Sequence, residues 1–134
     1  GRYLVKAVGI RDFGIADTEI EIVNEKPKFK YSDICFSITH CGKYIAAAFD
    51  KVECGLDIEE MKERDLNALS KRYERDFNSV EEFYTFWTEY EAEIKLQQEM
   101  KGKYSTVFKN NYMLTAVSAD PTFSQPSCIS CFDV

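Results

Sequence analysis

The sequence predicts an α+β fold in which an antiparallel sheet packs against one long helix. Several short segments alternate apolar and polar residues, as half-buried strands do, and turn residues separate them. Residues 79–100 instead repeat apolar residues every three or four positions, which is the period of a helix. The chain has 134 residues, 45% of them hydrophobic, which is enough for one core. We therefore expect a single domain over residues 1–134.

The first part of the chain predicts a helix followed by a strand. Residues 3–10 have mixed helical spacing and look like the end of a helix whose beginning lies outside the chain. A break at residues 14–17 precedes an alternating strand at residues 18–23. The chain then turns at residues 24–27, where we expect Pro27 to stop any strand ladder because it has no backbone N–H.

Residues 34–59 predict three strands around the single histidine, His40. Two apolar runs, 34–36 and 44–49, flank this histidine and a turn at residues 41–43. The third strand is expected at residues 55–59. Side chains alternate along a strand, so Leu56 and Ile58 should face one way and Asp57 and Glu59 the other.

The second half predicts the helices and a hairpin. Residues 60–77 indicate a short amphipathic surface helix, and Ser79 with Glu82 has the spacing of a capping box for the long helix. That helix is expected to end near Met100, closed by Gly102. The stripe that should face the sheet consists of Val80, Phe83, Trp87, Tyr90 and Ile94. The expected strands that follow are a hairpin of residues 104–108 and 112–117, and an edge strand at 128–132.

Composition excludes several classes of function. A net charge of −6 and a pI near 4.9 argue against nucleic-acid binding through an extensive basic surface. The longest apolar run, residues 44–49, is far short of a membrane span. Five cysteines form no disulfide framework, which is typical of reduced thiols. We therefore expect a cytoplasmic protein that binds neither membrane nor nucleic acid.

Three groups of side chains are candidates for chemistry, each with a plain structural alternative. Asp57 and Glu59 either face solvent or, as hard oxygen ligands beside Gly55, hold magnesium. Glu91 and Lys95 lie one helical turn apart, either as a surface pair or at the margin of a cleft. His40 is either an ordinary strand-end histidine or, with the groups around it, part of a phosphate site. Those groups are Ser37, Thr39, Gly42 and Lys43.

Four segments combine these residues in a recognisable order. They are Lys26-Pro27, residues 36–43 (FSITHCGK), residues 55–59 (GLDIE) and residues 87–95 (WTEYEAEIK). Across about seventy residues they resemble the motifs of 4′-phosphopantetheinyl transferases of the larger type that activates peptide synthetases. The resemblance implies a Mg²⁺-dependent transfer of the phosphopantetheine arm of coenzyme A to a serine of an acyl or peptidyl carrier protein, with release of 3′,5′-ADP. Such enzymes serve fatty-acid, polyketide and nonribosomal-peptide synthesis.

The resemblance also implies roles for individual residues. Asp57, Glu59 and Glu91 would be the metal ligands, with Glu91 also the base for the serine proton. The catalytic set would be Glu91, Lys95 and Asp57, with Lys95 stabilising the pyrophosphate. The coenzyme A contacts would come from Lys26, Pro27, Thr39, His40, Lys43 and Lys95.

The chain departs from the family pattern in three ways. Tyr90 stands where lysine is usual, and Cys41 where serine or threonine is usual. The third departure is length: residues 1–50 look like the remnant of an N-terminal half, and residues 51–134 like the C-terminal half with the metal site. Either the chain is a fragment or a partner subunit completes the site, as in a homo-oligomer. The alternative function is a coenzyme A or carrier-protein binding module with little turnover.

Overall fold

The computed structural model describes residues 1–127 and shows a mixed α/β fold with three helices and three small antiparallel sheets over that range. The predicted mixture of helix and antiparallel strand is confirmed, whereas the prediction of one sheet is wrong. The helices are α1 (Arg2–Phe13), α2 (Leu66–Tyr73) and α3 (Val80–Leu96). The strands are β1 (Ile20–Val23), β2 (Lys26–Phe29), β3 (Cys35–Cys41), β4 (Tyr44–Asp50), β5 (Cys54–Glu60), β6 (Gly102–Phe108) and β7 (Tyr112–Ser118). The edge strand expected at residues 128–132 lies outside the described residues.

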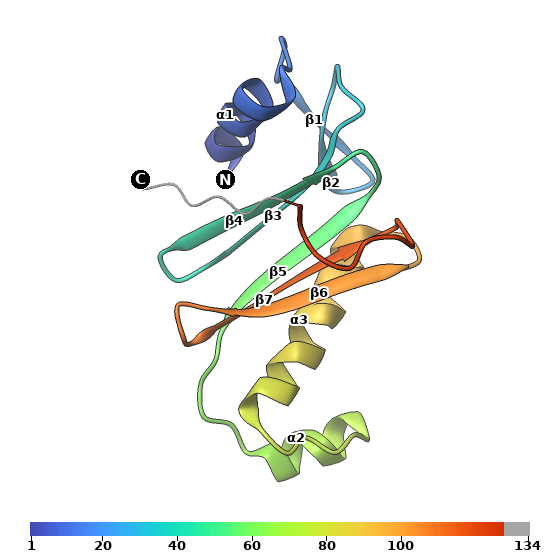
Figure 1. Ribbon diagram of the computed structural model, residues 1–134. Helices are drawn as coiled ribbons and strands as arrows, with labels where there is room; N and C mark the ends of the chain where they lie inside the picture. The colour runs from blue at the N-terminus through green and yellow to red at the C-terminus, as the bar shows by residue number, and fades with distance from the viewer. Residues whose placement is uncertain (128–134) are drawn as a thin grey trace.

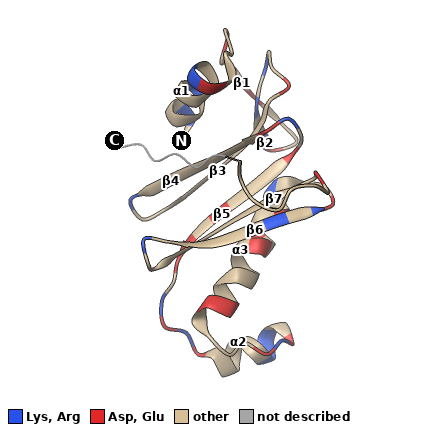
Figure 2. Cartoon of the chain, viewed as in Figure 1, with Lys and Arg blue, Asp and Glu red and all other residues tan. Residues whose placement is uncertain are grey.

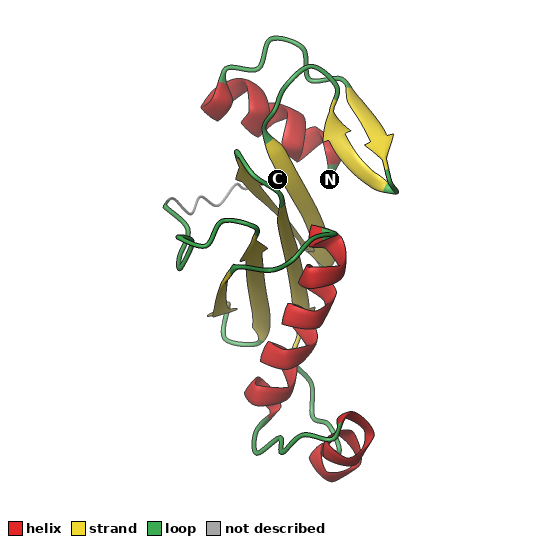
Figure 3. Cartoon of the chain, turned by 90° about the vertical axis from the view of Figure 1, so that its right-hand side faces the viewer, coloured by secondary structure: helices red, strands yellow, loops and turns green. Residues whose placement is uncertain are grey.

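The sheets follow one another from one end of the molecule to the other. At one end, α1 lies beside the β1–β2 hairpin and the β3–β4 hairpin (Figure 1). The apolar side chains of these elements meet around Val5, Phe29 and Phe36. Toward the other end, α3 packs against the three-stranded sheet β5-β7-β6, and α2 covers the start of α3 (Figure 3). The strand β5 is the edge of that sheet beside the β3–β4 hairpin, so residues on it contact both groups (Figure 1).

Pro27 does not stop the ladder, contrary to the prediction. It lies within β2 and is the partner of Ile22 in the antiparallel pair of β1 and β2. Asn24 and Glu25 form the two-residue turn, both with positive φ as a type I′ turn requires. Since Val23 and Lys26 close such a turn as a hydrogen-bonded pair, the next pair is a non-hydrogen-bonded one. Proline fits there because no N–H is needed.

The long helix begins as predicted but ends earlier. Ser79 caps it by accepting a hydrogen bond from the Glu82 N–H at 3.1 Å, and the Glu82 carboxylate accepts one from the Asn78 N–H at 2.6 Å. The helix ends at Leu96, where Gln97 takes a left-handed conformation with φ of 61°. Gly102, the expected end of the helix, instead begins β6.

Only the first part of the predicted apolar stripe of α3 meets the sheet, where buried Phe83 packs in one cluster with Met113 of β7. Tyr90 and Ile94 are 50% and 57% exposed. The face on the sheet instead carries Tyr84, Thr88, Ala92 and Leu96, all buried. Small residues allow this contact to be close: a Cβ on Gly55 would lie 2.1 Å from the Ala92 carbonyl oxygen. Because threonine and alanine give little hydrophobic signal, the sequence pattern favoured another side of the helix toward its end.

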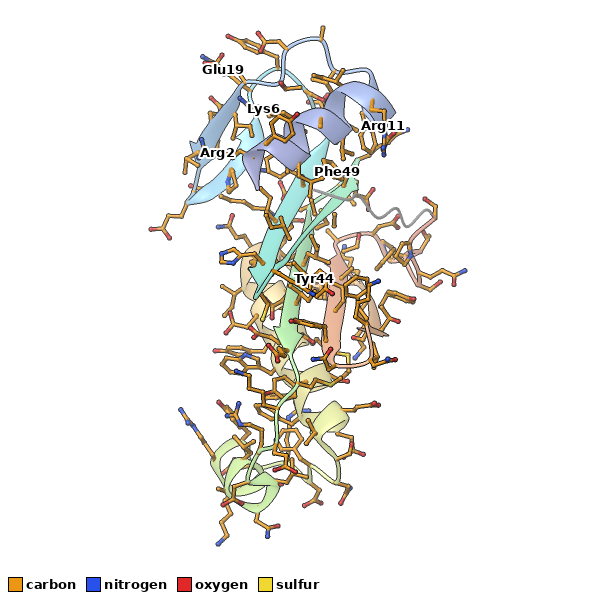
Figure 4. All side chains as sticks on the ribbon, turned by 90° about the vertical axis from the view of Figure 1, so that its left-hand side faces the viewer. Arg2, Lys6, Arg11, Glu19, Tyr44 and Phe49 are labelled. Atoms are coloured by element: carbon orange, nitrogen blue, oxygen red, sulfur yellow. The ribbon has the colours of Figure 1, made fainter. Side chains whose placement is uncertain are left out.

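The β3–β4 hairpin links the two ends of the molecule through its aromatic residues. Phe49 lies near α1, where its ring centroid is 5.4 Å from that of Phe13, while Tyr44 lies at the other end of β4 (Figure 4). The Tyr44 ring packs edge-on against Phe108 and Tyr112, at centroid distances of 5.2 and 4.9 Å.

No helix within residues 1–127 combines the length and the apolar character needed to span a membrane.

Candidate functional site

Asp57 is buried where three elements meet. On β5 it is 5% exposed, although the sequence placed it on a polar strand face. The helix α3 covers that face and brings the Lys95 ammonium to 3.3 Å from Asp57 Oδ1 and 2.9 Å from the Leu56 carbonyl oxygen. From β3, the Thr39 hydroxyl donates to the same Oδ1 at 3.3 Å. Two residues predicted for the site, Thr39 and Lys95, therefore contact a third, Asp57.

The second oxygen of Asp57 has no partner. Oδ2 is fully buried and accepts no hydrogen bond. Its acidic neighbour Glu59 lies within hydrogen-bonding range of Asp57, and a bond between the two carboxyls requires one of them to be protonated. Burial raises the pKa of the Asp57 carboxyl, while the Lys95 ammonium and the Thr39 hydroxyl oppose that rise. Asp57 thus carries a buried acceptor without a hydrogen-bond donor among the described residues.

Glu59 adds a second carboxylate, whose ionised form is destabilised by its surroundings. Burial raises the pKa of Glu59, and the negative charges of Asp57 and Glu91 raise it further. Acidic residues also appear along α3, whereas α2 carries basic ones (Figure 2). Among residues 1–127, Lys95 is the one cation beside these two acids, so they leave local negative charge that a bound cation would neutralise.

These residues fit a magnesium ion only in part. Within residues 1–127, no group of three or more histidine, cysteine, aspartate or glutamate side chains is arranged to hold a metal ion. The predicted ligand set of Asp57, Glu59 and Glu91 is therefore not assembled as a closed site. Magnesium is nevertheless often bound through one or two carboxylates, with waters and substrate phosphates as its other ligands. The unpartnered Asp57 Oδ2 and the adjacent Glu59 suit that open arrangement.

Lys26 belongs to a separate cluster. Its ammonium is buried and donates to the Cys54 carbonyl oxygen at 2.6 Å and to Glu53 Oε2 at 3.0 Å. Lys28 also pairs with Glu53, through Oε1. Burial acts to raise the pKa of Glu53, yet that pKa is lowered because Lys28 and Lys26 donate hydrogen bonds to the carboxylate. In this arrangement Lys26 joins β2 to the start of β5.

His40 and Lys43 lie at the turn end of the β3–β4 hairpin. Both are exposed. Because side chains alternate along β3, His40 points to the opposite side from buried Thr39. Lys43 lies in the turn with its ammonium 5.5 Å from the Tyr44 ring centroid. The described contacts do not join either side chain to the Asp57 cluster.

Glu91 and Lys95 do not form the surface ion pair that their spacing allows. Lys95 pairs with Asp57 instead, so it points toward the sheet. Glu91 is half-buried and acts on Glu59 through its charge. Tyr90 is half-exposed, and its ring stacks on Trp87 at a centroid distance of 5.7 Å.

Sequence reasoning missed two groups around the site. Glu53 was not predicted to matter, and the sequence pattern carried no signal that two lysines of β2 would meet it. The second is a chain of hydroxyls in which Thr115 Oγ1 lies 2.6 Å from Thr88 Oγ1 and 2.7 Å from Ser105 Oγ. A scan against protein-family models and a search of curated proteins found no match for this chain.

Proposed function

We propose that this chain transfers the 4′-phosphopantetheine arm of coenzyme A to a serine of a carrier protein. One observation carries the proposal: Thr39, Asp57 and Lys95 come from three separate segments with family-like motifs, and their polar atoms meet around Asp57 Oδ1. A purely structural α+β domain has no need for a buried aspartate with one unsatisfied oxygen, because such a group costs stability. That cost supports a functional reason for the cluster.

Each residue of the cluster has a task in this reaction. Asp57 and Glu59 hold the cation, and magnesium when bound would neutralise charge on the pyrophosphate of coenzyme A. The Lys95 ammonium has three N–H donors and donates two hydrogen bonds to β5. One donor therefore remains for a phosphate oxygen. Exposed His40 and Lys43 supply further donors at the hairpin end.

The reaction is a phosphoryl-type transfer with a simple balance. The serine oxygen of the carrier forms a bond to the β-phosphorus of coenzyme A, and the bond from that phosphorus to the bridging oxygen breaks. The serine proton passes to Glu91, directly or through water, and 3′,5′-ADP leaves. Glu91 is half-buried on α3, close enough to the acid pair to influence Glu59.

A second candidate function is a coenzyme A or carrier-protein binding module with little turnover. Two observations favour it. Tyr90 puts an aromatic ring beside Glu91 where the family has a positive charge. Lys26, a predicted coenzyme A contact, has its ammonium in the buried pair with Glu53. Both features would reduce the number of cations near a bound pyrophosphate.

The test is transfer of a fluorescent pantetheine arm from a coenzyme A conjugate to a panel of apo carrier proteins, with and without magnesium. We expect magnesium-dependent labelling that Asp57→Asn abolishes. Glu60→Gln is the matched control, because Glu60 lies on the same strand but outside the cluster, and labelling should persist. Coenzyme A binding without labelling would support the binding module. If neither coenzyme A nor magnesium changes the melting temperature, both functions are wrong.

A further inference from the structure

Two hydroxyls of β3 bind the backbone of β5, although these two strands belong to different sheets. Ser37 Oγ accepts a hydrogen bond from the Leu56 N–H at 3.0 Å, and Thr39 Oγ1 accepts one from the Ile58 N–H at 3.2 Å. Both side chains are only 4% exposed. The two hydroxyls therefore have equivalent roles toward the backbone of β5.

Thr39 has an additional role that Ser37 lacks. Its hydroxyl donates to Asp57 Oδ1, the same oxygen that Lys95 contacts from α3. The carboxylate is thus held from two sides through one oxygen, and its other oxygen, Oδ2, remains buried and unpartnered. The rotation of the Asp57 side chain is restrained by these donors, which sets the direction of Oδ2.

The same geometry leaves Thr39 without a proton for a phosphate. A hydroxyl has one hydrogen to donate, and a phosphate oxygen needs a donor. In Thr39 that hydrogen is used by Asp57, while the oxygen accepts from Ile58. The direct coenzyme A contact expected of Thr39 from the sequence would require breaking the bond to Asp57.

We propose that Thr39 is a positioning residue for the cation site: it fixes Asp57 so that Oδ2 faces the cation, and it makes no contact with coenzyme A. This inference rests on the proposed function for the identity of the cation. It assigns Thr39 an effect on the affinity for divalent metal rather than on the affinity for the co-substrate. The effect passes through Asp57, since Thr39 itself is not a ligand.

Thr39→Val and Ser37→Ala make a matched pair. Each removes one hydroxyl that accepts from a β5 N–H, so both should lower the melting temperature. Only Thr39→Val also releases Asp57. Binding of Mn²⁺, measured by electron paramagnetic resonance on the purified chain, reports the metal site without any need for activity.

We expect Thr39→Val to weaken Mn²⁺ binding about fivefold, the loss that corresponds to one hydrogen bond. Ser37→Ala and Thr39→Ser should bind Mn²⁺ within about twofold of the unmodified chain, because the Asp57 contact is kept. If Thr39→Val does not fold, Thr39→Cys replaces it, and its weaker donor should shift the affinity in the same direction. In the transfer assay, half-saturating magnesium should rise while the KM for coenzyme A stays constant.

Several outcomes overturn the inference. One is Mn²⁺ affinity in Thr39→Val equal to that in Ser37→Ala. A second is a raised KM for coenzyme A with unchanged metal affinity, which would make Thr39 a phosphate contact. A third is the absence of any Mn²⁺ binding by the unmodified chain. A chain that binds Mn²⁺ in the predicted order of variants but transfers nothing would contradict the proposed function and leave the positioning role standing.

Discussion

Glu53 and Asp57 are four residues apart along the chain, and the fold treats their carboxylates in opposite ways. Glu53 receives two ammonium groups, from Lys26 and Lys28, and its pKa is lowered by these donors despite its burial. Asp57 shares one ammonium with a carbonyl, keeps one oxygen unpartnered, and has its pKa raised by burial. The acid just before β5 is electrostatically satisfied, and the acid at the centre of β5 is not.

This difference separates an anchor from a candidate site. A buried acid with enough cations around it holds β2 against the start of β5. A buried acid with an unmet acceptor costs stability unless a ligand supplies the missing positive charge. A cation is therefore expected to bind beside the acid that lacks neighbouring positive charge, whatever the number of acids.

The largest expected effect comes from removing the charge of the anchor. Glu53→Gln leaves the buried Lys26 ammonium without an anionic partner, so we expect the free energy of unfolding to fall by about 3–5 kcal/mol. Chemical denaturation of purified protein measures this. The control is Glu19→Gln, which breaks an exposed 3.9 Å contact with Lys30 and should cost less than about 1 kcal/mol. Equal losses in the two variants would remove the distinction between anchor and surface pair.

Gly55 lies between the two acids and tests whether they are independent. Gly55→Ala would place a Cβ against the Ala92 backbone, so α3 must move away from β5 at a cost of about 3 kcal/mol. Lys95 would move with the helix, whereas the Lys26–Glu53 contact comes from β2 and should remain. Hydrogen exchange should therefore accelerate in α3 but not in the β1–β2 hairpin. Faster exchange in both would show that the surroundings of Glu53 and Asp57 act as one unit.

The sequence predicted the local elements around this strand better than their packing. Strand β5, the capped start of α3 and the hairpin of β6 and β7 follow from alternation, a capping box and turn residues, all of which are local signals. The side of α3 that faces the sheet was predicted correctly only at its start, because contact with Gly55 selects small residues such as Ala92 and not the most apolar ones.

The site residues show the same division between local and long-range information. Alternation placed Asp57 and Glu59 on one strand face, but not the burial of that face by α3. The helical spacing of Glu91 and Lys95 suggested a pair with each other, whereas Lys95 reaches Asp57 across 38 positions of the chain. The pairing of Lys26 with Glu53 likewise depends on how β2 meets β5, which no single segment encodes.

The unsatisfied acid should respond to neutralisation in the direction opposite to the anchor. Asp57→Asn removes a buried negative charge with an unpartnered oxygen, so we expect the free energy of unfolding at neutral pH to rise by about 1 kcal/mol. The measurement is denaturation in the presence of a chelator, so that no divalent cation compensates the charge in the unmodified chain. A loss of stability in this variant would mean that the Asp57 charge is already satisfied by Lys95 and Thr39.

The smallest and most specific effect is the pH dependence of the stability that Glu53 and Asp57 contribute. The Glu53 pKa is lowered from 4.5, so the stability that Glu53 contributes is present above that value and is lost as the pH falls through its folded-state pKa. The Asp57 pKa is raised from 3.8, so the folded state holds its proton more tightly and stability is lost as the pH rises from 3.8 through the folded-state pKa. Unfolding free energies of the unmodified chain minus those of Glu53→Gln should therefore increase with pH in the acidic range. The corresponding difference for Asp57→Asn should decrease, and added Mg²⁺ should reduce that decrease because a bound cation favours the ionised carboxylate. Slopes of the same sign for both acids would contradict the contrast between Glu53 and Asp57.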